Sequence, residues 1–416
     1  MRLLFLTHRL PYAPNRGDRI RAFHLIRFLA GSFEIHLVSL VHDDDEWSHR
    51  GDLSALTAST DVARVSRLRR ALPAVLSLPG SRPLTHALLH SRSVRTVLAR
   101  RIARSRPDVA LVYCSGMARY ALGSELQGIP FVLDLVDVDS EKWRALALES
   151  GFPRRWLYER EARLLRRFEE KALLTAASTT VVSDREREKL PASVAQRVQV
   201  VRNGVDIEWF APSSPPSESN QVIFTGVFDY PPNQRAALWF ARDVWPLVVR
   251  SRPDARLLLA GMNPPPAVQR LARDSTIQVT GAVADMRPLL WQSSLAIAPL
   301  DIARGLQNKV LEAVAAGLPC VVTPQVAAGL PRGILPACSV EPSPEGFARA
   351  VLALLDLTPP ERRARAGEAK LTLFTWDRQL QPMASLLHAA AQGMPMSASP
   401  TVNEPRGSDD AGSSRL

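Results

Sequence analysis

The sequence has few cysteines, few aromatic residues and no long apolar run. Its three cysteines, Cys114, Cys320 and Cys338, lack the spacing of metal ligands and are too few for a disulfide framework. The longest apolar runs, such as 109–113 and 294–300, fall far short of the roughly 20 residues that a membrane span needs. The apolar stretch at the N-terminus is also too short for a signal peptide. We therefore expect a cytoplasmic protein without a transmembrane helix.

Two common nucleotide-binding motifs are missing as well. The loop that follows the first apolar run has neither a Gly-x-Gly-x-x-Gly pattern nor a Walker lysine, which disfavours hydride transfer and ATP hydrolysis. The arginine-rich stretches contain few interleaved aromatic residues and no known nucleic-acid-binding motif. We therefore expect no nucleic-acid partner.

Positive charge is in excess, and it lies mostly in the first half. Residues 1–210 hold 33 Lys and Arg against 24 Asp and Glu, whereas the remainder holds 19 against 17. The arginines cluster at 64–70, 92–106 and 154–167. A basic face suits an anionic membrane surface or a phosphate-bearing acceptor. Solvated basic helices without a partner are the alternative.

Both halves of the chain alternate short apolar runs with helical stretches such as 18–30 and 154–175. The expected strands are 2–7, 35–41, 109–113, 130–136, 178–182 and 198–201, then 221–226, 255–260, 277–280, 294–298 and 319–323. Nearly continuous apolar strands are typical of parallel sheets that helices cover on both faces. The pattern predicts an α/β protein of two doubly wound, Rossmann-like domains facing a cleft.

Composition also predicts the domain boundaries. The Pro- and Ser-rich segment 211–220 breaks both helix and strand, so we place a linker there, between a domain at 1–210 and a domain at 221–374. A helix is expected over 375–392. The tail 393–416 is rich in Ser, Pro, Gly and Asp and is predicted to be disordered.

The loop after the first strand is the first candidate site. It begins at His8, a candidate catalytic residue, and leads into a helix at Gly17 and Asp18. Backbone amides at a helix N-terminus bind anions, and glycine lets a ligand approach the backbone. A simple turn, with Asp18 as the N-cap, is the alternative.

Acidic residues around the strand at 130–136 form the second candidate. Asp137 and Asp139 follow this strand at its carboxyl end, where they could bind sugar hydroxyls, orient an acceptor or act as a general base. Asp134 lies within the strand, and a buried carboxylate is costly unless it is paired. Structural pairing with Lys142 or Arg144 is the alternative.

The third candidate is the segment 303–322, in which a loop with Arg304 and Gly305 leads into an Ala-rich helix. Lys309 and Glu312 are three residues apart and therefore share one helix face. A lysine can balance phosphate charge, and a glutamate can accept hydrogen bonds from a ribose diol. The alternative is an exposed ion pair of little energetic consequence.

These segments, in this order, resemble retaining glycosyltransferase family 4, which has the GT-B fold. The family resemblance rests on 293–323, 181–183, 203–206, 222–226, 257–261 and 279–281. The segments 7–21, 133–143 and 225–233 are similar to a narrower subgroup, the sugar transferases encoded with exosortase and PEP-CTERM exopolysaccharide systems.

The resemblance implies roles for several residues of this chain. Glu312 would bind the donor ribose, and Gly17 would lie near the donor phosphates. The positions of three other family contacts hold different residues. Arg304 stands where the family has a glutamate on the transferred sugar, and Val227 and Asn233 stand where it has a basic pair.

Other groups must then neutralise the donor phosphates. Arg202, Arg304 and Lys309 are the candidates, and Gly226 and Gly305 complete the expected donor site. Asp301 is a possible substitute for the missing glutamate. In the first domain, Asp137 stands near the position of a family histidine. Asp139 and Lys142 are expected on the acceptor side.

By this resemblance the protein moves a hexose from a UDP- or GDP-sugar to a lipid-linked or polysaccharide acceptor in exopolysaccharide biosynthesis, with retention. The domain at 1–210 would bind the acceptor, the domain at 221–374 the nucleotide sugar, and the helix at 375–392 would return to the first domain. No metal and no cofactor are expected. The expected location is the cytoplasm, including the inner face of the membrane. A sugar-nucleotide epimerase of the same fold and a non-catalytic sugar-nucleotide-binding protein are the alternatives.

Overall fold

The computed structural model describes residues 1–12, 17–65, 80, 82–213, 215, 217–303 and 306–394, with only the backbone at Gly17, Asp18 and Arg92. These residues form two compact units. The first comprises Met1–Val201 and the chain from Pro382 onward, and the second comprises Arg202–Gln381. The predicted tail is outside the described residues from 395 onward.

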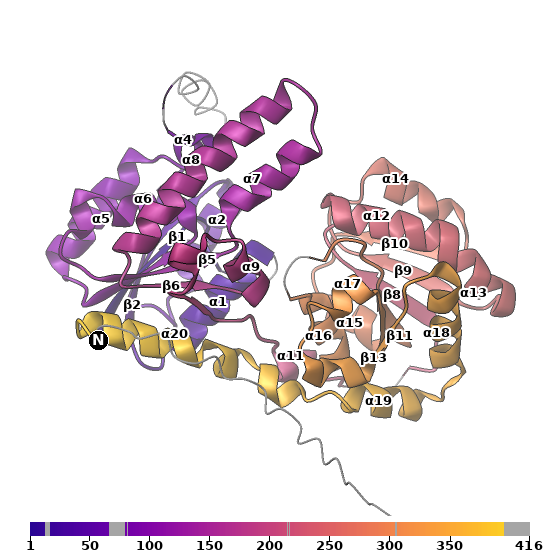
Figure 1. Ribbon diagram of the computed structural model, residues 1–416. Helices are drawn as coiled ribbons and strands as arrows, with labels where there is room; N and C mark the ends of the chain where they lie inside the picture. The colour runs from indigo at the N-terminus through magenta and orange to yellow at the C-terminus, as the bar shows by residue number, and fades with distance from the viewer. Residues whose placement is uncertain are drawn as a thin grey trace, which may run out of the picture. The chain divides into compact units, whose positions relative to one another are not determined.

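The first unit contains a seven-stranded parallel sheet in the order β3-β2-β1-β4-β5-β6-β7. Its strands are β1 (Arg2–Thr7), β2 (Glu34–Val41), β3 (Ser59–Arg64), β4 (Val109–Tyr113), β5 (Phe131–Val136), β6 (Ser178–Val181) and β7 (Val198–Val200). Helices lie on both faces of this sheet (Figure 1). They are α1 (Gly17–Leu29), α2 (Asp44–Ser48), α4 (Leu84–Leu88), α5 (Arg92–Arg104), α6 (Ser115–Ala121), α7 (Asp139–Leu148), α8 (Arg154–Thr175), α9 (Asp184–Glu188) and α10 (Ala192–Ala195).

The second unit contains a six-stranded parallel sheet in the order β10-β9-β8-β11-β12-β13. Its strands are β8 (Gln221–Thr225), β9 (Arg256–Ala260), β10 (Ile277–Gly281), β11 (Leu295–Ala298), β12 (Cys320–Val322) and β13 (Cys338–Val340). Its helices are α11 (Ile207–Phe210), α12 (Pro231–Trp239), α13 (Trp245–Ser251), α14 (Pro266–Gln269), α15 (Arg287–Trp291), α16 (Asn308–Ala315), α17 (Pro324–Ala327), α18 (Pro344–Asp356) and α19 (Pro359–Gly367). Each sheet therefore follows the doubly wound plan that the apolar strands predicted.

The second unit begins earlier than the predicted linker at 211–220. Val205 is buried in the core of the second unit, and its backbone N–H donates to the carbonyl of Phe374 at 2.8 Å. The indole N–H of Trp291 donates to the carbonyl of Phe210 at 2.9 Å. These contacts attach residues 202–210 to the second unit, so the division lies between Val201 and Arg202.

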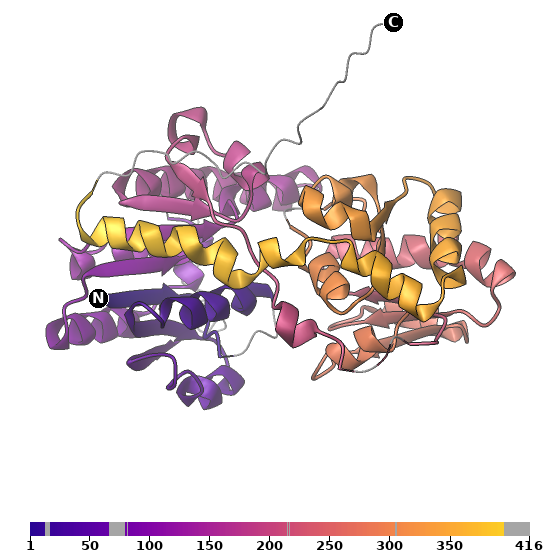
Figure 2. The ribbon, with the colours of Figure 1, turned by 90° about the horizontal axis from the view of Figure 1, so that it is seen from below.

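The last helix, α20 (Trp376–Ala391), contains the second division between the units, at Gln381 and Pro382. Trp376 is buried in the second unit, whereas Leu386 and Leu387 are buried in the first. His388 stacks on Phe33 with the ring centroids 4.6 Å apart. The later part of α20 thus runs along the first unit (Figure 2).

Candidate active site

The strand order places a binding edge in the second unit between β8 and β11. From β8 the sheet continues to β9 and β10 on one side, and from β11 it continues to β12 and β13 on the other. Ligands of doubly wound folds bind at the carboxyl ends of the two strands where the order reverses in this way. Gly226 follows β8 and the loop to α16 follows β11. Gly226, Lys309 and Glu312, which the sequence singled out, therefore belong to segments that start at this edge of the sheet.

A cavity of about 270 Å³ lies at this edge. It is lined by Tyr230, Asn233, Leu300, Ile302, Leu306, Gln307, Asn308 and Lys309. Polar groups at the start of α16 thus face apolar side chains of the preceding loop. Such a mixture of apolar walls and a few polar groups is typical of small-molecule sites.

Lys309 is held at the cavity by neighbours from other elements. Its ammonium donates a hydrogen bond to Asn233 Oδ1 at 2.7 Å and lies 4.6 Å from the ring centroid of Phe224. Asn233 in turn donates to the carbonyl of Val227 at 2.9 Å. Burial lowers the pKa of Lys309 to about 7, and the nearby carboxylate of Glu312 only partly opposes this. The amine is poised to gain charge when an anion binds.

Glu312 lies one turn further along α16, on the same face as Lys309. Burial raises its pKa to about 7, and Lys309 lowers it in part. Among the described residues, no hydrogen bond to its carboxylate is found. Asn308 Oδ1 is a buried acceptor without a partner in that part of the chain. An unpaired buried acceptor is costly, so Asn308 fits a ligand that supplies a donor, and the half-buried Glu312 carboxylate is open to one as well.

Two glycines bring the strand ends close together at this site. A Cβ on Gly226 would stand 3.0 Å from Asn233 Nδ2 and 3.2 Å from Lys309 Nζ. Gly261 follows β9 with φ at +148°, and a Cβ there would overlap the carbonyl oxygen of Gly226. The absence of a side chain at Gly226 therefore leaves room for the hydrogen-bonded pair of Lys309 and Asn233. Its absence at Gly261 leaves room for the Gly226 carbonyl.

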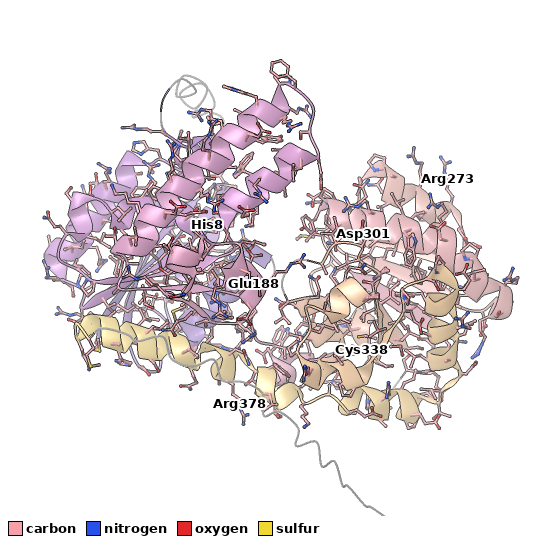
Figure 3. The ribbon with its side chains drawn as sticks, in the orientation of Figure 1. His8, Glu188, Arg273, Asp301, Cys338 and Arg378 are labelled. Atoms are coloured by element: carbon pink, nitrogen blue, oxygen red, sulfur yellow. The ribbon has the colours of Figure 1, made fainter. Side chains whose placement is uncertain are left out.

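The other residues predicted for the donor site in this half have separate outcomes. Arg304 and Gly305 lie outside the described residues. Arg202 is not among the residues that line the cavity. Asp301, labelled in Figure 3, follows Leu300. Its carboxylate pairs with the guanidinium of Arg235 at 3.0 Å. Asp301 therefore already has a basic partner.

Sequence reasoning missed three polar groups at the cavity. Tyr230, Gln307 and Asn308 line it, and none was predicted as a site residue. Asn308 directly precedes Lys309 at the first position of α16, so its place in the chain was a usable signal. Asn233 was recognised only as a departure from the family pattern, although it holds the lysine.

In the first unit, the corresponding binding edge lies between β1 and β4. His8 follows β1 and stacks on Tyr113 of β4, with parallel rings 5.9 Å apart (Figure 3). Cys114, directly after β4, and Val136, at the end of β5, have φ of 69° and 66°. Such values are rare for residues with side chains and concentrate at functional sites.

The acidic residues after β5 form a cluster with Lys142. The Lys142 ammonium lies 3.1 Å from Asp137 Oδ2 and 3.2 Å from Asp139 Oδ1. Ser115 donates a hydrogen bond to Asp139 at 2.6 Å. The structure thus brings together Asp137, Asp139 and Lys142, and their mutual pairing is the structural alternative that the sequence left open.

Asp134 has a structural role. It is fully buried and accepts hydrogen bonds from Arg21 Nε at 2.7 Å and from the Thr180 hydroxyl at 2.9 Å. This pairing satisfies the carboxylate within the sheet, as a buried charge requires. It also fixes α1 against β5 and β6.

The loop between β1 and α1 is anchored by arginines at its two ends. Arg9 and Arg19 both contact buried Glu46, at 2.6 and 2.8 Å. Helix α1 begins at Gly17, so the backbone of Gly17 and Asp18 lies at a helix N-terminus, as the sequence predicted. Nothing more is described of the Asp18 side chain.

The two-sheet architecture is the GT-B fold, and solved structures of this class match it over nearly the whole chain. Sucrose-phosphate synthase from Thermosynechococcus elongatus superposes with a TM-score of 0.66 at 14% identity, covering 94% of this chain and 100% of its own. Anabaena HepE in complex with UDP gives 0.62 at 14% identity with the same coverage. The predicted fold is confirmed.

Residues 219–357 match a family model described as glycosyl transferases group 1. The second unit therefore carries a glycosyltransferase domain, and the cavity lies within it. A structure described as a putative UDP-N-acetylglucosamine 2-epimerase from Listeria monocytogenes shares the fold as well, with a TM-score of 0.58 at 13% identity over 94% of this chain and 97% of its own. No curated protein matches the chain.

The part of the chain that the structure describes contains no helix with the length and hydropathy of a membrane span. The same residues contain no group of three or more His, Cys, Asp or Glu side chains that could hold a metal ion.

Proposed function

We propose that this protein is a retaining glycosyltransferase of family 4, in the subgroup associated with exosortase and PEP-CTERM systems. It would move a hexose from a UDP- or GDP-sugar to a lipid-linked or polysaccharide acceptor in exopolysaccharide biosynthesis. The observation that carries the proposal is the cavity in the glycosyltransferase domain, which Lys309 and the unpaired Asn308 Oδ1 line, with Glu312 one turn further along α16. HepE, a neighbour in fold, is described in complex with UDP-glucose.

Each group of the second unit has a role in this reaction. Lys309 and the N-terminus of α16 bind the diphosphate, and Glu312 accepts hydrogen bonds from the ribose diol. As the bond between sugar C1 and the diphosphate oxygen breaks, negative charge grows on the diphosphate. Fixed positive groups that face this charge lower the barrier. Arg304, Gly305, Arg202 and Gly226 complete the proposed donor site.

The first unit supplies the acceptor side. Asp137 and His8 are the proposed catalytic residues, Asp139 and Lys142 contact the acceptor, and Gly17 and Asp18 lie near the donor phosphates. The acceptor hydroxyl oxygen forms the new bond to C1 as the bond from C1 to the diphosphate oxygen breaks, and its proton passes to Asp137 as the general base. Neither a metal nor a cofactor takes part. The protein works in the cytoplasm and associates with the inner face of the membrane through its basic first unit.

The substitution Glu312→Ala tests the proposed function. We expect turnover to disappear and UDP affinity to fall at least tenfold, because the ribose hydroxyls lose the carboxylate that accepts their hydrogen bonds. Calorimetric titration with UDP measures the affinity, and sugar transfer from a panel of UDP- and GDP-sugars to a membrane extract, in buffer with EDTA, measures turnover.

Glu345→Ala is the matched control, because Glu345 is an exposed glutamate on another helix of the same unit. Circular dichroism should show the same fold for both variants. Wild-type UDP affinity in Glu312→Ala would contradict the donor-site assignment. Turnover that requires a divalent ion would contradict the metal-free mechanism.

An epimerase is the second candidate function, because a structure described as a putative UDP-N-acetylglucosamine 2-epimerase shares the fold. An epimerase converts a nucleotide sugar without any acceptor. Product analysis by NMR, with the sugar nucleotide alone and then with membrane extract, separates the two. Binding without conversion in either mixture would favour a non-catalytic sugar-nucleotide-binding protein.

A further inference from the structure

Helices α7 and α8 form a hairpin that projects from the first unit (Figure 1). The backbone N–H and the hydroxyl of Ser140 both donate to Glu169, at 3.1 and 2.5 Å, and tie the two helices together at the base. Further out, the rings of Trp143 and Tyr158 pack with their centroids 5.2 Å apart. The helices therefore hold the turn between them, residues 149–153, away from the sheet.

Large apolar side chains gather at the tip of this hairpin. Phe152 is 89% exposed, Leu148 74% and Trp156 52%. Together with Leu146, they make four of the eleven exposed large apolar side chains among the described residues, within one stretch of the chain. Several exposed apolar side chains gathered in one place are typical of an interaction surface.

Basic residues adjoin the apolar tip. Arg154 and Arg155 are exposed next to Phe152, and Arg163, Arg166 and Arg167 continue the exposed basic surface along α8. Helix α8 carries seven basic residues against four acidic ones, and two of the acidic ones, Glu161 and Glu169, are buried. The occupant of this surface must therefore accept apolar side chains and carry negative charge.

We infer that the tip of the α7–α8 hairpin, residues 146–156, docks into the surface of a membrane that contains anionic lipid. Tryptophan and phenylalanine favour the boundary between lipid tails and headgroups, and the adjacent arginines attract anionic headgroups. A second copy of the chain fits less well, because two such tips would bring like charges together. This inference deepens the membrane association proposed above and does not depend on the donor site.

The hairpin also connects the membrane to the proposed acceptor residues. Asp139 and Lys142 lie in the first turn of α7, and Leu148 is its last residue. Ten helical residues span about 15 Å at 1.5 Å each. A docked tip would thus hold Lys142 and Asp139 about 9 to 14 Å along the helix from the boundary it enters, within reach of the phosphate-bearing headgroup of a lipid-linked acceptor.

Vesicle flotation with the full-length protein tests this inference. The vesicles are phosphatidylcholine alone, or phosphatidylcholine with one third phosphatidylglycerol, at low salt. We expect the wild type to prefer the anionic vesicles at least tenfold. The double substitution Phe152→Ser with Trp156→Ser should lose at least tenfold in affinity for them, because its apolar tip is gone. Arg154→Gln should lose about fivefold, and only at low salt.

Leu174→Ser is the matched control, because Leu174 is 58% exposed at the opposite end of the same helix. It should bind vesicles as the wild type does, and all variants should keep the thermal stabilisation by UDP. Equal flotation of the double variant and the wild type would overturn the inference, and so would a wild type that does not float. It would also fail if the double substitution abolished a wild-type dimer in sedimentation while leaving vesicle binding unchanged. A wild type that does not bind UDP would count against the proposed donor site alone.

Discussion

At the scale of single residues, Lys309 and Glu312 show how a binding site departs from an ordinary helix surface. On a solvated helix, a Lys and a Glu three residues apart would form a weak ion pair. Here both are partly buried, and burial moves the pKa of each toward 7, Lys309 downward and Glu312 upward. Burial thus makes both side chains less stable in their charged forms, and a bound nucleotide diphosphate would offset this cost.

Lys309→Met should stabilise the free protein and abolish UDP binding. The folded-state pKa of Lys309 is lowered to about 7 from 10.5, so burial of the charged amine destabilises the fold most below pH 7. That destabilisation fades as the pH rises from about 7 to 10.5, where the unfolded chain also loses its proton. We therefore expect a higher melting temperature for the variant at pH 7 and a smaller gain at pH 10.

Thermal melts of wild type and variant over this pH range measure the effect. Lys370→Met is the control, because Lys370 is an exposed lysine of the same unit. If the gain in melting temperature of Lys309→Met did not shrink at high pH, removal of a buried charge would not be its cause.

At the scale of elements, the apolar runs predicted the interior strands closely, whereas two edge strands were missed. β3 and β13 each lie at the edge of a sheet. The sequence of β3, Ser59–Arg64, is polar and mostly half-buried, and β13 has only three residues. An edge strand has one neighbour and is less covered, so it does not need the continuous apolar run that identifies a central strand.

The glycines after β8 and β9 lead to a prediction on stability. Gly261→Ala should destabilise the second unit by more than about 2 kcal/mol, because φ is +148° and a Cβ would overlap the Gly226 carbonyl. Gly367→Ala is the control. A Cβ at Gly367 meets no atom within 4 Å at the end of α19, so this change should stabilise by up to about 1 kcal/mol. Urea unfolding of both variants measures the difference, and equal midpoints would contradict the close approach.

At the scale of the whole molecule, the chain passes between the units at Val201 and again within α20. The later part of α20 belongs to the first unit, although every strand of that unit comes far earlier in the sequence. Met383, Leu386 and Leu387 are buried there, and His388 stacks on Phe33. The first unit is therefore completed only by the C-terminal part of the chain.

Ending the chain at Gln381 should destabilise the first unit by more than about 4 kcal/mol, because three large apolar side chains are lost from its core. A chain that ends at Met394 is the control, since it keeps all of α20. Urea unfolding followed by circular dichroism would show an earlier transition in the shorter chain. An unchanged unfolding profile would mean that α20 contributes nothing to the first unit.

The sequence by itself determined the alternation of strands and helices, the doubly wound plan and the excess of basic residues. These features depend on neighbouring residues along the chain, whose propensity and burial period are local. It also identified Lys309, Glu312, Asp137 and Asp139 as candidates, because strand ends and helix starts can be located from such patterns.

Only the tertiary structure decided which of these groups meet. Lys309 contacts Asn233 across 76 positions of the chain, and Asp134 contacts Arg21 across 113. Strand order sets these contacts, and burial at those meeting points shifts the pKa values. The exposed tip of α7 and α8 likewise became visible only in three dimensions, because local apolar periodicity does not reveal which side chains the fold leaves uncovered.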